Sequence, residues 1–260
     1  MYLPAAHVEK STEALLEFIK QNPLGVLTTA IASPSYPLIQ ASHVPWVLDI
    51  IEPPSQNDDD DGKVKGRLRG HMAKQNPQAK ALIESITSSS STTLEQDVLV
   101  LFTGSDHSYV TPKFYTETKP TTGKVVPTWN YAAVQVYGKA TIWVNSKSAE
   151  TSNFLNKQIS DLSLLAETSI MGFDGKPNAP WTVSESPERF IELLKTNIIG
   201  IEISITHISG KFKMSQEMGK LDREGVIEGF KNLGTEKGDR ILKLIKQRSD
   251  IKEASKNASG

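Results

Sequence analysis

The chain has 260 residues, no cysteine and a formal net charge of −1. This length allows one large domain or two small ones with a sizeable core. The missing cysteines exclude disulfides, thiolate metal sites and cysteine nucleophiles, and the near-zero net charge gives no overall attraction to nucleic acid or to anionic membranes. The start of the chain lacks the pattern of a secretory signal, and no apolar stretch reaches membrane-spanning length. We therefore expect a soluble cytoplasmic or nuclear protein.

The first part of the chain is predicted to form a helix followed by strands. Apolar residues at helical spacing predict a helix over residues 11–21, which Asn22 and Pro23 end. Strands are predicted over residues 24–30, 38–48, 64–71 and 97–102. The second of these is broken at Pro45, because proline cannot donate a hydrogen bond to a neighbouring strand. A helix is predicted over residues 74–84, with Pro77 in its first turn.

The remainder of the chain alternates between strands and helices without a regular order. Strands are predicted over residues 107–111, 132–144 and 199–208. Helices are predicted over residues 146–160, from Ser186 onward, and over 236–248, and residues 161–186 are expected to be irregular. The strand at 199–208 alternates isoleucine with smaller or polar residues, which is typical of a strand with one buried face. Gly138 is expected to mark a bulge or a close approach of another strand.

These patterns predict a mainly β protein with flanking helices, of the α+β class. Strands and helices do not alternate strictly, which disfavours a doubly wound parallel sheet. An antiparallel, six- to seven-stranded, Greek-key-like barrel fits better. We expect the barrel domain to span residues 1–230, with mobile inserts near 55–63 (acidic) and 87–95 (Ser-rich). Residues 231–260 are expected to add a C-terminal helix and a frayed tail.

Five polar and aromatic clusters lie at the ends of predicted strands, and they resemble the wall of a ligand site. The most informative is Thr128-Trp129-Asn130-Tyr131, where a planar heterocycle could stack and Asn130 could donate to ring oxygens. Two aromatic residues that plug a barrel end are the alternative. The segment Gly70–Asn76 passes from strand to helix, where His71 and Lys74 could bind a phosphate, or the helix could simply be capped. Lys211, Lys213, Ser215 and Gln216 could close a phosphate site or form a solvated turn.

Other kinds of site find no support in the spacing of residues. The five histidines show no helical metal-binding pair and no acidic residue spaced to complete one, so no metal site is expected. Nucleophile-elbow, P-loop and dinucleotide-binding motifs are absent from the sequence.

The clusters in order resemble the PaiB-type FMN-binding family, a family of FMN-binding split barrels that carries the name of negative transcriptional regulators. The similarity extends over residues 1–230 through blocks of sequence that share their order. These blocks include Met1-Tyr2-Leu3-Pro4, Asn22-Pro23-Leu24-Gly25, Ala41-Ser42-His43-Val44-Pro45, Arg69-Gly70-His71-Met72-Ala73-Lys74-Gln75-Asn76-Pro77-Gln78, Tyr109-Val110-Thr111-Pro112, Val126-Pro127-Thr128-Trp129-Asn130-Tyr131 and Gly210-Lys211-Phe212-Lys213-Met214-Ser215-Gln216.

The resemblance implies a homodimer with FMN in a groove between subunits. The implied cofactor-binding residues are Ser42, His43, His71, Lys74, Asn76, Thr128, Trp129, Asn130, Tyr131, Gln135, Lys213, Ser215 and Gln216. The family usually carries threonine in place of Ser42 and often arginine in place of Lys74, and lysine lacks the bidentate fork of arginine. The catalytic residues stay unknown.

Three functions compete at this point. The first is a flavin-dependent oxidoreductase or flavin-linked regulator, in which FMN carries the electrons. The second is a transcriptional regulator without turnover, although no helix-turn-helix or basic helix is recognisable and nucleic acid is not an expected partner. The third is a haem-binding or haem-degrading split barrel with His43 or His207 as ligand. A scaffold that has lost its cofactor is a further alternative.

Overall fold

The structure, a computed structural model, describes residues 1–51, 65–175 and 177–258, and it divides into two compact units. Unit 1 comprises Met1–Leu15, Thr103–Val134 and Ser209–Gly260, and unit 2 comprises Leu16–Phe102 and Gln135–Ile208. The predicted acidic insert at 55–63 lies outside the described residues. The domain boundary predicted at residue 230 stays a prediction.

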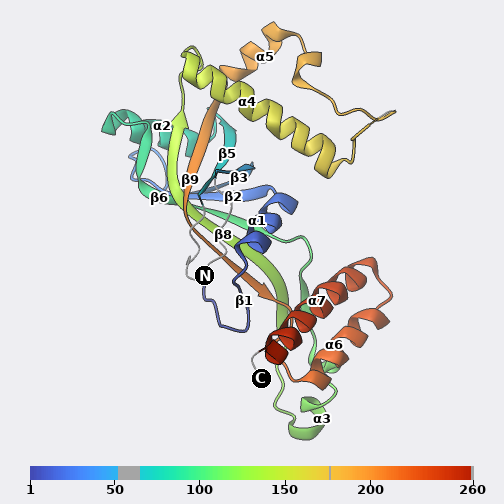
Figure 1. Ribbon diagram of the computed structural model, residues 1–260. Coiled ribbons are helices and arrows are strands. Elements are labelled where there is room, and N and C mark those ends of the chain that lie inside the picture. Colours follow the sequence, from blue (N-terminus) through green and yellow to red (C-terminus); the bar gives the residue numbers. More distant parts are fainter. Residues whose placement is uncertain (52–64, 176, 259–260) are drawn as a thin grey trace. The chain divides into compact units, whose positions relative to one another are not determined.

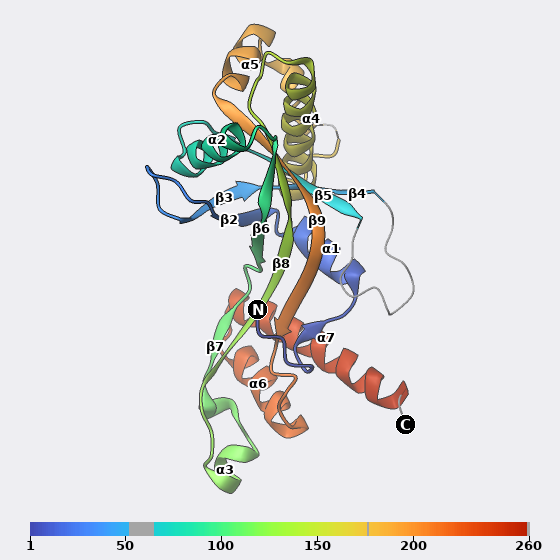
Figure 2. The same cartoon turned by 90° about the vertical axis from the view of Figure 1, so that its left-hand side faces the viewer.

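Unit 2 is built on an open antiparallel sheet with the strand order β3-β2-β6-β8-β9-β5-β4. The strands are β2 (Leu24–Ala30), β3 (Ile39–Pro45), β4 (Val47–Ile50), β5 (Gly66–Ala73), β6 (Thr93–Thr103), β8 (Thr128–Trp143) and β9 (Ile198–Lys213). Figures 1 and 2 together label these strands, and the two long strands β8 and β9 have residues in both units. Within the described residues the end strands β3 and β4 do not pair with each other. The predicted fold class is confirmed; in the described residues the sheet has nine strands rather than six or seven, and it is open rather than closed into a barrel.

The core of unit 2 lies on one face of β9. Ile199, Ile201 and Ile203 are fully buried, as the alternating pattern predicts. Gly138 on β8 lets β9 approach closely, because a Cβ atom there would lie 2.2 Å from the backbone oxygen of Ser204. The close approach predicted at Gly138 is therefore confirmed. The break predicted at Pro45 also occurs, since β3 ends there and β4 begins at Val47.

Helices flank this sheet, and two of them begin at capping side chains, Asn76 for α2 and Ser148 for α4. They are α2 (Pro77–Ser89), α4 (Ala149–Leu165) with the π-helical η2 (Ala166–Ile170), the 3-10 turn η3 (Val183–Glu185) and α5 (Glu188–Lys195), while α1 (Thr12–Gln21) has residues in both units. Asn76 caps α2 by accepting a 2.8 Å hydrogen bond from the Gln78 amide. In the Ser-rich segment at 87–95, residues 87–89 form the last turn of α2 and residues 93–95 begin β6; its being a mobile insert stays a prediction.

Unit 1 combines strand pairing with two C-terminal helices. Its elements are β1 (Val8–Glu9), β7 (Ser108–Val110), the 3-10 turn η1 (Pro112–Phe114), α3 (Thr118–Thr122), α6 (Lys220–Asn232) and α7 (Glu236–Ala258). β1 pairs with β9, and β7 pairs with β8. Helices α6 and α7 lie side by side in both views (Figures 1 and 2). The sequence predicted α7 up to residue 248, and it continues to Ala258.

Helix α6 was not predicted, and its glycines explain why. Gly225 and Gly229 lower helix propensity, but both face the η1 turn. A Cβ atom at Gly229 would lie 2.3 Å from the ring of Phe114, and one at Gly225 would lie 2.2 Å from the Phe114 oxygen. The Phe114 ring also meets the Phe230 ring edge-on at 5.4 Å. Tertiary packing on Phe114 therefore favours glycine where the helix propensity scale does not.

Candidate functional site

The predicted cofactor-binding residues divide into two groups, one in each unit. Unit 2 holds Ser42, His43, His71, Lys74, Asn76 and Gln135. Unit 1 holds Thr128, Trp129, Asn130, Tyr131, Lys213, Ser215 and Gln216. Each group is described within its own unit.

In unit 2, Asn76 ties the start of α2 to strand β3. Its Nδ2 atom donates to Ser42 Oγ at 3.1 Å, while its Oδ1 atom caps the helix. Both side chains are half-buried. His43 is the neighbour of Ser42 on β3 and is exposed. The structure therefore brings Ser42 and Asn76 into direct contact, as a shared site requires.

Lys74 lies at the turn between β5 and α2, and its ammonium group is already engaged. The Nζ atom donates to the backbone oxygen of Thr196 at 2.8 Å. An ammonium group has three hydrogens, so two remain for another acceptor. The backbone amide of Lys74 donates to the oxygen of Asn197, which fixes the turn.

His71 lies on β5 opposite Gly200 of β9. Burial lowers the pKa of its imidazole. Its Nδ1 atom is buried and has no hydrogen-bond partner in the described part of the chain. A neutral ring of this kind suits a hydrogen bond to an uncharged acceptor or donor better than an ion pair with a phosphate. Gln135 of the same unit is half-buried on β8.

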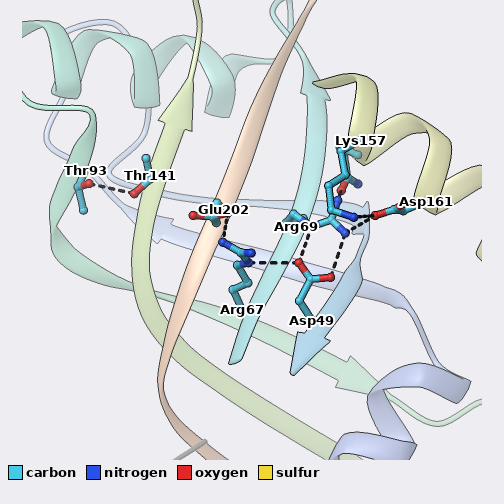
Figure 3. A network of polar contacts seen from close by, with 9 residues as sticks. Asp49, Arg67, Arg69, Thr93, Thr141, Lys157, Asp161 and Glu202 are labelled. Atoms are coloured by element: carbon cyan, nitrogen blue, oxygen red, sulfur yellow. Dashed lines mark hydrogen bonds and ion pairs between the residues drawn. The ribbon is translucent and has the colours of Figure 1, made fainter. Parts of the chain in front are cut away.

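The strongest electrostatic feature of unit 2 is a network around Arg69 (Figure 3). Arg69 is 2% exposed, and it holds Asp49 with two hydrogen bonds, from Nε at 2.6 Å and from Nη2 at 2.9 Å. It also bonds Asp161 of α4 at 2.6 Å and Gln158 at 3.3 Å. Arg67 on the same face reaches Asp49 and Glu202, both at 3.2 Å. The network fastens α4 to β4 and β5.

The two carboxylates of this network have lowered pKa values. Burial raises the pKa of Asp49, but its bonds to Arg69 and the charges of Arg69 and Arg67 outweigh burial. Burial likewise raises the pKa of Asp161, and bonds to Lys157 and Arg69 outweigh it. Arg67 and Arg69 share a face because they are two residues apart on a strand, but Asp161 and Glu202 lie 92 and 135 residues from the arginines that they bind, so no local pattern predicts the network.

In unit 1, Asn130 and Ser215 form a buried pair that joins β8 to the turn after β9. Both residues are fully buried. Asn130 Nδ2 donates to Ser215 Oγ at 2.9 Å, and the Ser215 hydroxyl lies 3.2 Å from Asn130 Oδ1. Ser215 has a φ of 61°, in the left-handed region that favours glycine. Because neither side chain reaches the surface, the pair is placed to position its neighbours.

Gln216 also serves the turn after β9. Its side chain accepts from the Met214 amide at 2.5 Å and donates to the Phe212 oxygen. Lys213 points the other way: its Nζ atom donates to Thr128 Oγ1 at 2.6 Å and pairs with Glu217 at 2.9 Å. Burial raises the pKa of Glu217, and the Lys213 contact, with smaller contributions, lowers it below its usual range.

Trp129 stands at the centre of an exposed aromatic group. Its side chain is held by His107, whose ring lies 6.0 Å away at an interplanar angle of 29°, and whose Nδ1 accepts from Trp129 Nε1 at 3.3 Å. Tyr109 meets Trp129 edge-on at 6.2 Å. Trp129 and Tyr109 are each 49% exposed. We call Trp129, His107 and Tyr109 the aromatic platform.

The sequence did not identify His107 as a site residue. Its position at the start of the predicted strand 107–111 was the available signal. Tyr131 is half-buried, with the Lys211 ammonium 5.5 Å from its ring centre and the Tyr2 ring on the same ammonium at 5.8 Å. The sequence assigned no role to Tyr2, and it offered Lys211 as part of a phosphate site or of a solvated turn.

Metal-binding clusters and membrane spans were also sought in the described residues. No group of three or more histidine, cysteine, aspartate or glutamate side chains there could hold a metal ion. No helix in those ranges combines the length and apolar character that crossing a membrane requires.

Comparisons with known proteins show which family the chain belongs to. An uncharacterised protein of Aspergillus fumigatus is 58% identical over 260 residues, covering 97% of this chain and 99% of the relative. The protease synthase and sporulation protein PAI 2 of Bacillus subtilis is 25% identical over 249 residues, covering 95% and 98%. Among solved structures, the FAD and heme binding protein of Mycobacterium smegmatis aligns with a TM-score of 0.42 and 13% identity, covering 79% of this chain and 73% of that one.

A family model described as "Putative FMN-binding domain" matches residues 1–207. The match supports FMN as the cofactor and confirms the predicted resemblance to PaiB-type proteins. The chain belongs to this FMN-binding domain family.

Proposed function

We propose that the protein is a flavoprotein that binds FMN, and that the aromatic platform of unit 1 receives the flavin ring. The observation that carries this proposal is the exposed face of Trp129. A large aromatic side chain held by His107 and Tyr109, yet half open to solvent, fits a planar ring that stacks on it.

The residues beside the platform supply polar contacts of the kind a flavin ring needs. The Thr128 oxygen accepts from Lys213, so its own hydrogen is available to a ring oxygen or nitrogen. The buried Asn130–Ser215 pair fixes the strand end that carries Trp129 and Tyr131. When bound, FMN supplies the electron-transfer chemistry, and these residues hold and orient its ring.

The residues predicted to bind phosphate in unit 2 form a separate proposal, which stands within that unit and does not depend on the ring assignment in unit 1. Ser42 and Asn76 are in contact, and two N–H donors of the Lys74 ammonium group remain available for phosphate oxygens. His71 is assigned a hydrogen-bonding role rather than a charged one, because burial lowers its pKa.

FMN titration monitored by flavin fluorescence tests the ring assignment. Stacking of a base on an aromatic side chain contributes on the order of 1–3 kcal/mol, so Trp129→Ala should weaken the binding of FMN and of riboflavin alike by about 5- to 150-fold. Trp181→Ala is the matched control, because Trp181 is also exposed, at 40%, and lies in unit 2. Wild-type affinity in Trp129→Ala would refute the ring assignment.

The phosphate assignment is tested separately. Lys74→Gln should weaken FMN and leave riboflavin, which has no phosphate, unchanged. An equal loss for both ligands, or no loss for either, contradicts the assignment.

The proposal extends to a cytoplasmic homodimer with oxidoreductase activity. Light scattering coupled to size exclusion tests the dimer, and cell fractionation tests the compartment. Anaerobic mixing of the FMN-loaded protein with a reduced nicotinamide cofactor tests electron uptake, with bleaching of the flavin absorbance as the expected result. Persistent yellow colour with every donor tried would favour the alternative of a regulator without turnover.

A further inference from the structure

A cavity of about 800 Å³ lies in unit 2 between the segment that leads into α4 and helix α5. Its lining is rich in hydroxyl groups and charged side chains: Ser146, Lys147, Ser148, Ser152, Arg189, Glu192 and Thr196 contribute polar atoms. Cavities of this size hold small organic ligands. None of these residues belongs to the predicted FMN site.

Two cationic side chains of the lining have no ion-pair partner in the part of the chain that the structure describes. Lys147 and Arg189 are both exposed, and neither forms an ion pair within residues 1–51, 65–175 and 177–258. Glu192 is the acidic residue of the lining, and its carboxylate is paired at 2.5 Å with the Lys195 ammonium. The net local charge is therefore positive, which favours an anion.

The Lys195 ammonium group, which pairs with Glu192, also contacts a hydroxyl of the cavity wall. Lys195 is 1% exposed, and its Nζ atom donates to Ser152 Oγ at 3.1 Å and to Asn156 Oδ1 at 2.7 Å. The Ser152 oxygen thus accepts from a cation, which leaves its hydroxyl hydrogen to donate toward the cavity. The Thr196 backbone oxygen also accepts from Lys74, so another ammonium group lies at the rim.

We propose that this cavity binds the phosphate group of a small molecule, with Arg189, Lys147 and Ser152 as its donors. A guanidinium group offers paired N–H donors that match phosphate oxygens, and an ammonium group adds a point charge. The cavity volume leaves room for the remainder of a phosphate monoester. The site does not require that the flavin assignment be correct, because free phosphate offers the same chemistry.

Isothermal titration calorimetry with inorganic phosphate tests the proposal on the full-length protein, both flavin-free and loaded with FMN. We expect saturable binding of one phosphate per chain. The double variant Lys147→Gln, Arg189→Gln should weaken it by at least about tenfold, since each removes a charge-assisted contact. Both side chains are exposed, so circular dichroism of the variant should match the wild type. Lys243→Gln, which removes an exposed charge from α7, is the control and should bind phosphate as the wild type does.

The titration of FMN-loaded protein shows which molecule supplies the phosphate group. Unchanged phosphate binding in loaded protein assigns the cavity to a separate phosphorylated molecule. Competition by FMN but not by riboflavin, together with weaker FMN binding in the double variant, assigns it to the phosphate of FMN itself. Absence of saturable binding, or a double variant that binds like the wild type, overturns the proposal. A protein that binds phosphate but no flavin would contradict the proposed function and would still support this phosphate site.

Discussion

Replacing Arg69 should destabilise the protein far more than replacing Arg67, although the two lie on the same face of β5. The Arg69 side chain is 3% exposed and makes four hydrogen bonds, three of them to carboxylates. Arg69→Ala leaves Asp49 and Asp161 without their buried cation. Breaking a buried ion pair by removing one partner costs about 3–5 kcal/mol.

The lower end of that range is expected here, because Asp49 and Asp161 are partly solvated. Their side chains are 24% and 33% exposed, so water can replace part of what they lose. We therefore expect Arg69→Ala to lower the free energy of unfolding by about 3 kcal/mol. Arg67→Ala removes contacts of a side chain that is 40% exposed and should cost about 1 kcal/mol or less.

Urea unfolding at pH 7, followed by circular dichroism, measures both variants. Arg69→Lys should recover only part of the loss, because an ammonium group cannot reproduce the two parallel bonds to Asp49. Equal losses for Arg69→Ala and Arg67→Ala would refute the view that the buried arginine fastens α4 to the sheet.

The acid side of the stability profile gives an independent check of the same network. Asp49 and Asp161 have lowered pKa values in the folded protein. The contribution of these two ionised carboxylates to the free energy of unfolding is present above their ordinary pKa of about 4. It is lost as the pH falls below that value and through their lower pKa values in the folded protein. Arg69→Ala should flatten this part of the profile. A profile of unchanged slope would show that Arg69 does not set these pKa values.

Three further outcomes follow from the packing. Gly138→Ala should destabilise by about 1–3 kcal/mol in urea unfolding, because its Cβ meets the Ser204 backbone oxygen at 2.2 Å; a neutral result would contradict the close approach. Asn130→Ala should lower the free energy of unfolding by about 1–3 kcal/mol, because the buried Ser215 hydroxyl loses its partner. The same variant should bind FMN more weakly; an unchanged FMN affinity would contradict the positioning role of Asn130. His71→Gln should reduce the loss of stability on acidification below about pH 6.5, because the folded pKa of His71 is lowered and its protonation favours unfolding; an unchanged profile would contradict a buried neutral ring.

Much of the fold could be predicted from local patterns. β2 coincides with the predicted strand, and the break between β3 and β4 falls at Pro45, because alternation and proline act on the nearest neighbours in the chain. Helix α6 was missed since its glycines make sense only against Phe114, which lies more than a hundred residues earlier.

The candidate site was harder to predict in detail. Residue types at strand ends indicated a ligand wall, and the structure brings Ser42 to Asn76 and Thr128 to Lys213. The residue types at the strand ends could not show how deeply each side chain is buried. Asn130 and Ser215 are enclosed, whereas Trp129 is half exposed, so residues adjacent in sequence have different relations to solvent. Partners distant in sequence, such as His107 for Trp129, also carry no local signal.

The visible absorbance spectrum of the purified protein, with mass spectrometry of whatever heat releases, tests FMN binding most directly. The account predicts a flavin spectrum and the mass of FMN, or the appearance of both after FMN is added to colourless protein. A Soret band would instead support haem. A colourless protein that does not bind added FMN would contradict the central claim of FMN binding and would leave a split-barrel fold without a flavin.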